Sequence, residues 1–121
     1  YMELTLQKNL SKFYIKSFTG KSFIIGDNEY IGNIIIDEKI ISWNIKKSEL
    51  FDLKNYNSMM ISKPDIIIIG CGNKQFLPTH DFIDHFVSNN IGIEIMTTES
   101  ACKTFNILIS EQRKVIAGLI I

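Results

Sequence analysis

The stretch PDIIIIGCG, at residues 64–72, decides the fold of this chain. Four consecutive isoleucines predict a strand that is buried on both faces, and the Gly-x-Gly that follows predicts a tight turn at its carboxyl end. Four further elements are expected downstream: a helix over about 79–89, a strand over 93–96, a helix over about 99–110 and a last strand over 114–121. Residues 64–121 are therefore expected to form a βαβαβ unit with a mixed or parallel sheet, in a protein of the α/β class.

The first third of the chain has a different pattern, in which short β-rich runs alternate with turns. The runs cover residues 13–18, 22–25, 29–36 and 39–45. Turns this tight between runs this short predict an antiparallel β meander over residues 12–45. Gly32 interrupts the third run, which indicates a bulge or a close approach of the backbone. Trp43 is expected in the core of the meander.

Two segments outside these units are more weakly patterned. Residues 1–11 are expected to form a flexible or extended arm. Residues 46–63 form a connector in which we predict a short helix near 47–54, broken at Asn55. The run of residues 59–61 in the same connector, Met-Met-Ile, is expected to be a hydrophobic plug or contact patch. The whole chain, residues 1–121, is predicted to be a single domain, because its length supports one core and not two.

The composition excludes several classes of protein. Thirteen basic and thirteen acidic residues give a formal net charge of +0, so the chain lacks the charge of a general nucleic-acid binder. No apolar run reaches the length that spans a bilayer, and Glu3, Gln7 and Lys8 interrupt any apolar region that a signal peptide would need. The two cysteines lack a Cys-x-x-Cys spacing, which is typical of a reducing compartment. We therefore expect a cytoplasmic protein with no transmembrane segment.

A candidate ligand site is expected at one edge of the sheet. If the strands over 65–69 and 93–96 are parallel neighbours, the turn after the first and the helix after the second fall at the same edge, where open α/β sheets bind ligands. The amino end of that helix would offer N–H groups to an anion. The candidate residues are Gly70, Cys71, Gly72, Thr98, Cys102, Lys103, Thr104 and Asn106. The alternative is that the glycines only form a turn and that Thr98, or Thr97 beside it, is a helix cap.

The two cysteines and one polar helix face carry side chains that could take part in chemistry. Cys71 and Cys102 could meet at the sheet edge, where an early helical position would lower the pKa of Cys102, or both could be buried structural residues. No histidine lies near either cysteine in sequence to act as a base. His80, Asp81, Asp84 and His85 form two His/Asp pairs on one helix face, and a solvated face is favoured over a metal clip. We predict no catalytic residue, no metal and no cofactor. Phe105 is expected in the core, and Asn106 is expected to bond to neighbouring backbone.

An ordered set of residues resembles a small family of domains of unknown function. That family includes archaeal and bacterial stand-alone proteins and the mitochondrial respiratory complex I assembly factor 3. The resemblance runs from Tyr30 onward and is carried by residues 32–36, Trp43, 64–72, Phe76-Leu77-Pro78, 92–96, Thr98, 101–106 and the closing apolar strand. Lys103 stands where the family is expected to have arginine, which would weaken a bidentate contact. The resemblance implies a three-layer fold: a central mixed sheet, two main helices and an N-terminal antiparallel β layer.

Two functions from different classes follow. The favoured one, implied by the resemblance and by the lack of a complete catalytic constellation, is a non-enzymatic protein-binding or assembly module. Its partner would be another protein, with a respiratory-complex subunit as one candidate, or a second copy of the chain. It should carry an exposed apolar patch, at residues 59–61 or along a sheet edge. The alternative is a protein or enzyme that binds a small anion or metabolite between residues 70–72 and 98–103. A dimerisation domain with an inert sheet edge is the third possibility.

Overall fold

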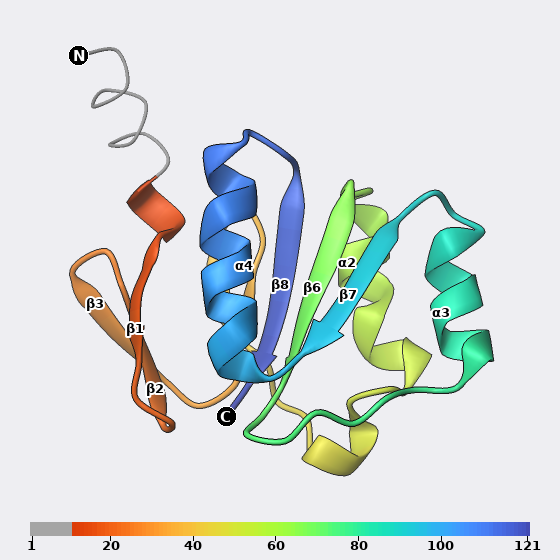
Figure 1. The fold of residues 1–121 in the computed structure, drawn as a ribbon, viewed down its shortest axis with the longest axis horizontal. Coiled ribbons are helices and arrows are strands. Elements are labelled where there is room, and N and C mark those ends of the chain that lie inside the picture. The colour runs from red at the N-terminus through yellow and green to blue at the C-terminus, as the bar shows by residue number, and fades with distance from the viewer. Residues whose placement is uncertain (1–10) are drawn as a thin grey trace.

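A computed structural model describes residues 11–121, so most of the predicted N-terminal arm lies outside the described residues (Figure 1). The described chain begins with a 3-10 turn, η1 (Ser11–Phe13). Eight strands and three α-helices follow, with two more 3-10 turns between the fifth strand and the first of these helices. The chain is an α/β protein with a mixed sheet, as predicted.

Five strands form the central sheet, in the order β5-β4-β8-β6-β7. They are β4 (Ile34–Ile36), β5 (Ile40–Ser42), β6 (Ile66–Cys71), β7 (Gly92–Met96) and β8 (Val115–Ile120). β6 is parallel to both β7 and β8, whereas β4 is antiparallel to β5 and β8. The βαβαβ unit is therefore confirmed. β8 is the middle strand of the sheet, because the chain crosses back past β6 after forming β7 and places β8 on the other side of β6.

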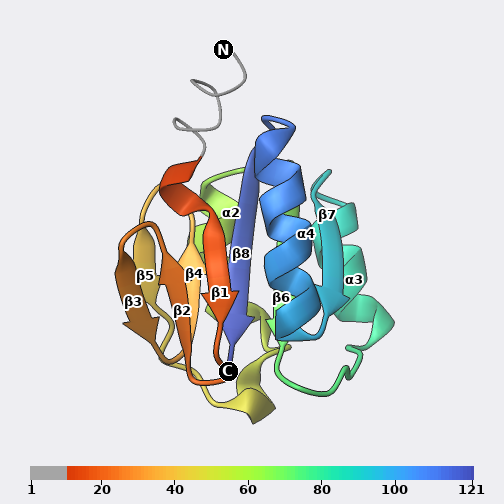
Figure 2. The ribbon, with the colours of Figure 1, turned by 60° about the vertical axis from the view of Figure 1, so that its left-hand side comes forward.

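The two main helices lie on opposite faces of the central sheet. α3 (His80–Val87) connects β6 to β7, and α4 (Thr98–Ser110) connects β7 to β8. The first connection leads from β6 outward to the edge strand β7, and the second leads from β7 back past β6 to β8. Because crossovers between parallel strands are right-handed, that reversal places the two helices on opposite faces. α4 shares its face with the N-terminal sheet, and α3 shares the other with α2 (Asn57–Ile61), which gives the three expected layers (Figures 1 and 2).

The predicted meander over 12–45 does not stay in one sheet. β1 (Ile15–Phe18), β2 (Ser22–Ile25) and β3 (Asn28–Ile31) form a separate antiparallel sheet, while β4 and β5 join the central one. The run predicted over 29–36 is therefore two strands. Gly32, with a φ of 86°, lies at the kink between them, and the left-handed region favours glycine there. The isoleucines of β4 are buried because they lie inside the central sheet.

The connector also differs from the prediction. The helix expected near 47–54 is replaced by two 3-10 turns, η2 (Lys47–Glu49) and η3 (Leu53–Tyr56), and α2 begins where a break was expected. The Asp52 carboxylate accepts a bond from the Lys54 N–H and starts the second turn locally. Met59 is fully buried whereas Ile61 is mostly exposed, so residues 59–61 do not form a continuous exposed patch.

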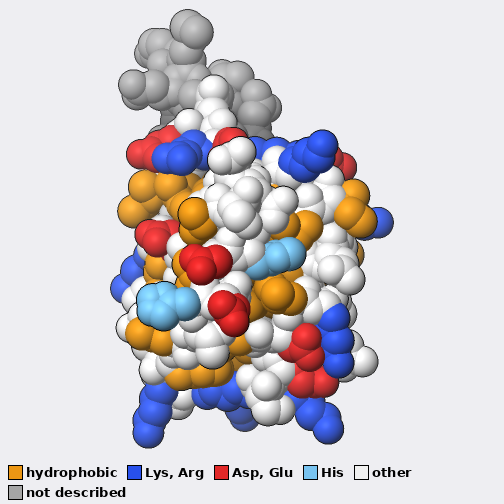
Figure 3. Space-filling model, turned by 90° about the vertical axis from the view of Figure 1, so that its right-hand side faces the viewer, with side chains coloured by type: hydrophobic (Ala, Val, Ile, Leu, Met, Phe, Trp, Pro, Cys, Tyr) orange, Lys and Arg blue, Asp and Glu red, His pale blue; other side chains and the backbone are white. Residues whose placement is uncertain are grey.

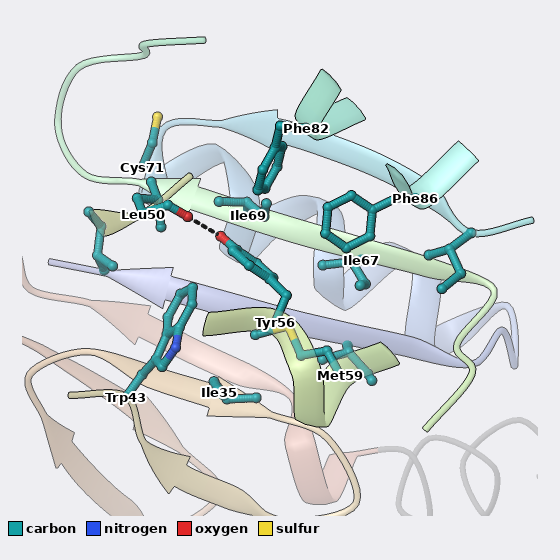
Figure 4. Packing of buried hydrophobic residues seen from close by; sticks show 13 residues of the cluster. Ile35, Trp43, Leu50, Tyr56, Met59, Ile67, Ile69, Cys71, Phe82 and Phe86 are labelled. Carbon is teal, nitrogen blue, oxygen red and sulfur yellow. Dashed lines mark hydrogen bonds between the residues drawn. The ribbon is translucent and has the colours of Figure 1, made fainter. Parts of the chain in front are cut away.

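Aromatic side chains fill the core between the central sheet and α2 and α3 (Figure 4). Tyr56 packs edge-to-face against Trp43, Phe82 and Phe86 at centroid distances of 5.3–5.6 Å, and its hydroxyl donates to the Leu50 carbonyl at 2.6 Å. Burial raises the pKa of Tyr56 well above its ordinary range, so the phenol stays protonated. Trp43 is a core residue as predicted, although it packs on the central sheet and not inside the meander.

Candidate functional site

The carboxyl ends of β6 and β7 meet as predicted, because the two strands are parallel neighbours with Gly70 opposite Met96. Thr98 connects the elements there. Its N–H donates to the Gly72 carbonyl and its hydroxyl oxygen accepts from the Gly72 N–H, both at 2.9 Å, while the hydroxyl donates to the carbonyl of Ile120. The residue is fully buried. Thr97 is the helix cap, since its side chain accepts from the Ser100 N–H.

The two glycines of the turn have different physical roles. A Cβ on Gly70 would lie 2.9 Å from the Cα of Thr98, so glycine allows α4 to approach the end of β6. Gly72 has a φ of 94°, which a side chain would strain. The ammonium of Lys47 lies 3.2 Å from where a Cβ of Gly72 would be. Gly70, Gly72 and Thr98 thus form a packed junction. The hydrogen bonds named above connect Thr98 to the backbone of Gly72 and of Ile120.

Cys71 and Cys102 lie on opposite faces of the central sheet. Cys71 belongs to the core under α2 and α3, and Cys102 belongs to the core between the sheet and α4. Both are free and buried, which favours the structural interpretation. Burial, with a smaller effect of the Glu99 carboxylate, raises the pKa of Cys102 to about 12. The expected lowering of that pKa is therefore wrong, because Cys102 follows the first turn of α4 and faces the core.

The Cys102 thiol is expected to resist modification in the folded protein. At pH 8 a pKa of about 12 lowers the thiolate fraction roughly a thousandfold relative to an ordinary cysteine. An unfolded chain loses this proton near pH 9, so the contribution of the thiol to stability is complete below pH 9 and decreases as the pH rises towards 12. Alkylation with iodoacetamide, followed by peptide mass spectrometry with and without urea, measures this. Equal labelling of Cys102 in both conditions would contradict the prediction.

The other three predicted residues point in different directions along α4. Lys103 is exposed and its ammonium lies 3.8 Å from the Glu99 carboxylate one turn earlier. The Thr104 hydroxyl donates to the sulfur of Met96 at 3.3 Å. Asn106 faces β1, where its side chain accepts from the N–H of Ile15 at 2.8 Å and donates to the carbonyl of Ile15 at 2.9 Å. The bonds of Asn106 are to backbone, as expected, but to backbone 91 residues away.

Replacing Asn106 with alanine is expected to destabilise the protein by about 2 kcal/mol, because two partly buried bonds to β1 are lost. The loss should fall mainly on the N-terminal sheet, so amide hydrogens of β1 and β2 should exchange faster while those of β6 and β8 change less. Hydrogen exchange by NMR measures both. Ser110→Ala is a control on the same helix, since the Ser110 hydroxyl bonds only within its own turn. An equal loss of protection throughout the molecule would contradict a docking role for Asn106.

The polar face of α3 is solvated. His80, Asp81, Asp84 and His85 are all exposed. Within residues 11–121, no group of three or more His, Cys, Asp or Glu side chains is placed to hold a metal ion. Among the described helices, none is long and apolar enough to cross a membrane.

A groove between α3 and β7 was not predicted as a site. It has a volume of about 380 Å³ and is lined by Leu77, Pro78, Thr79, His80, Ile83, Ile93 and Ile95. Leu77 is 71% exposed, and Val87 is an exposed apolar residue of α3. Figure 3 shows this side of the molecule, where hydrophobic and acidic side chains and one histidine lie in the middle, the second histidine lies towards the left, and the basic side chains lie towards the margin. The sequence signal was present in the apolar Phe76-Leu77-Pro78 of a loop and the alternating isoleucines of β7.

Comparison with known proteins places the chain in a family. The sequence model of the family described as "Protein of unknown function (DUF498/DUF598)" matches residues 15–120. The chain belongs to this family. This member of the DUF498/DUF598 family therefore has the three layers and the Thr98 junction described above.

Relatives of known name fall into two groups. The "13 kDa major membrane protein" of Francisella tularensis is 27% identical over 117 residues, which cover 94% of this chain and 95% of that protein. "NADH dehydrogenase [ubiquinone] 1 alpha subcomplex assembly factor 3" of Xenopus tropicalis is 25% identical over 95% of this chain and 65% of its own length. The Drosophila melanogaster assembly factor of the same name is 32% identical over 78% of this chain and 50% of its own length. The chain thus spans between half and two thirds of these assembly factors.

Solved structures support the fold. An NMR structure from Rhodopseudomonas palustris has a TM-score of 0.79 at 22% identity, over 91% of this chain and 84% of that one. A Bartonella henselae protein described as an outer membrane protein has a TM-score of 0.74 at 21% identity, over 91% of this chain and 95% of that one. At these identities the similarity establishes the fold alone.

Proposed function

We propose that this protein is a non-enzymatic binding module that helps to assemble a larger protein complex. The observation that carries the proposal is the apolar groove between α3 and β7, with the exposed Leu77 at its wall. Open apolar surface of this kind is typical of protein docking sites. The names of the complex I assembly factors support the same function, since 95% of this chain aligns with the Xenopus protein.

The partner is proposed to be another protein. A subunit of a respiratory complex is the first candidate because of the names of the relatives. A second copy of the chain is the other candidate. Nucleic acid is disfavoured, because a net charge of +0 provides little attraction for a phosphate backbone.

The test is affinity purification of the tagged chain from its own cells after mild chemical cross-linking. We expect one or more proteins, among them a respiratory-complex subunit, to be enriched in amounts comparable with the bait over a tag-only control. Light scattering of the purified chain distinguishes a monomer from a homo-oligomer. A bait recovered only as a monomer, with no enriched protein, would overturn the proposal.

The alternative function is binding of a small anion at the carboxyl edge of the sheet. It is supported by the Lys47 ammonium beside Gly72 and by the nearby amino end of α4. The Thr98 hydroxyl counts against it, because both of its hydrogen-bonding roles are already taken by backbone. Titration with inorganic phosphate decides the matter. Saturable shifts of the Gly72 and Lys103 amides would support an anion site, and unchanged amides would remove it.

A cytoplasmic location remains part of the proposal. It is supported by two free cysteines, the usual state of thiols in a reducing compartment. One relative is named a membrane protein. Cell fractionation with an antibody to the chain tests the location, and recovery in the membrane fraction would contradict it.

A further inference from the structure

We propose that the outer edge of β7 and the groove beside it bind an extended, positively charged segment of the partner protein, which joins the central sheet as a sixth strand. This inference rests on the proposed protein-binding function and specifies the surface and the chemistry of the partner. It is carried by three properties of the surface: the direction of the backbone groups of β7, the shape of the groove and the sign of the charge around it.

The backbone of β7 presents unpaired groups to an added strand. The Gly92 N–H donates to the Asp65 carbonyl at 2.9 Å, so the backbone groups of Gly92 point towards β6. Backbone groups of alternate residues point to opposite sides of a strand in a parallel sheet, so those of Ile93 and Ile95 point outward. The Gln75 side chain confirms this direction, because its amide donates to the outward carbonyl of Ile95 at 3.1 Å. β7 is also the last strand in the order of the central sheet.

This edge lacks several of the features that usually block strand addition. Residues 92–96 contain no proline and no lysine, and their pairing with β6 continues without a bulge. Natural edge strands are commonly protected by those devices, so an edge without them is a template for pairing, and its one charged side chain, Glu94, is exposed on the face away from the groove. Among the described residues, the exposed Gln75 amide is the one side-chain group that donates to a carbonyl of this edge, that of Ile95. A backbone N–H of the added strand could take its place.

The groove provides space for the side chains of the added strand. The side chains of Ile93 and Ile95 lie on the face of the sheet that α3 covers, and Ile83 and Leu77 line the same groove. Every second side chain of a strand points to the same face of its sheet. An added strand would therefore direct alternate side chains into the groove, which is how strand addition obtains specificity. Those side chains must be apolar, because the lining is mainly isoleucine, leucine and proline.

The charge around the groove selects a basic occupant. Between Lys74 and Lys103 the sequence contains no lysine or arginine and four carboxylates, namely Asp81, Asp84, Glu94 and Glu99. Asp81 and Asp84 are exposed on α3, and Glu94 is exposed on the other face of β7. Lysine or arginine at the alternate positions of the added strand would pair with Glu94 across the strands. A second copy would bring the same carboxylates to the interface, so charge favours a different, basic partner.

The test uses a synthetic peptide of alternating lysine and valine with blocked ends, titrated into the ¹⁵N-labelled protein. We expect the amides of Ile93 and Ile95 to shift and to exchange more slowly, and the affinity to fall as salt is raised. A matched peptide with glutamate in place of lysine should bind at least about tenfold more weakly. Leu77→Ser and Glu94→Lys should each weaken binding about fivefold. Ile107→Ser is the control, because Ile107 is 60% exposed on α4, away from the groove.

The inference would be overturned by equal binding of the two peptides, by shifts that map to β3 or β5, or by no shift at millimolar peptide. If light scattering shows that the wild type is a dimer and that Leu77→Ser is a monomer, the occupant of the groove is instead a second copy of the chain. The failure of the proposed function is separate. If the cross-linked partner is captured equally by the wild type and by the double variant Leu77→Ser, Glu94→Lys, protein binding stands and this surface is wrong. If the wild type captures no partner, the function itself is wrong.

Discussion

Replacing Gly70 with alanine is expected to destabilise the protein by about 3 kcal/mol, measured by urea unfolding. The added Cβ would lie 2.9 Å from the Thr98 Cα and 3.0 Å from a methyl group of Leu119. The nearest obstacle is backbone at the start of α4, so the contact cannot be relieved by turning a side chain. The whole helix would have to move away from the sheet, and its bonds to Gly72 and Ile120 would lengthen.

Gly92→Ala is the matched control, since Gly92 is also a strand glycine of the same sheet. Its Cβ would lie 3.4 Å from the nearest atoms, and its φ is not in the left-handed region. Alanine limits the unfolded chain more than glycine does, so the change should cost less than about 1 kcal/mol or be slightly stabilising. If the two substitutions had equal effects, the close approach of α4 to Gly70 would not be a determinant of the fold.

Replacing Thr98 with valine is the second large effect, with an expected loss of about 3 kcal/mol. Valine keeps the shape of the side chain but removes the hydroxyl, which leaves the N–H of Gly72 and the carbonyl of Ile120 buried without that partner. An unpaired buried backbone group costs about 1–3 kcal/mol. Urea unfolding measures the loss, and the amide of Gly72 should lose its protection from hydrogen exchange.

Thr98→Ser separates the hydroxyl from the methyl group. Serine keeps both hydrogen bonds and loses one buried methyl, which costs about 1 kcal/mol. Valine should therefore be clearly worse than serine. A serine variant as unstable as the valine variant would mean that packing, and not hydrogen bonding, is what Thr98 contributes.

Much of the fold could be predicted because the C-terminal half carries strong local signals. The isoleucine run gave β6, and Thr97, Gly92 and the apolar stripes placed α3, β7 and α4 within one or two residues. The parallel pairing of β6 and β7 followed from the alternation of strands and helices. It brought Gly70 and Thr98 to the same edge, as expected.

Other features depend on long-range contacts that no local pattern specifies. Ile34 could belong to a meander or to the central sheet, and only its pairing with Leu119 decides. The short turns of the connector are held by bonds such as that from Tyr56 to Leu50, which burial makes possible. The face of the sheet on which each cysteine side chain lies depends on the tertiary fold: on the orientation of β6 for Cys71 and on the face that α4 covers for Cys102. For that reason a set of eight residues could be predicted near one edge without converging on one pocket.

The central claim is that this protein acts by holding a partner at the groove between α3 and β7. The most direct measurement places a photo-crosslinking amino acid at Leu77 and, as a control, at Ile107, and then irradiates the cells that produce each variant. We expect a covalent adduct with a different protein from position 77 and little or none from position 107. An adduct from position 107 alone, or no adduct from position 77, would contradict the claim, whereas adducts in which position 77 links the chain only to itself would identify a second copy as the partner.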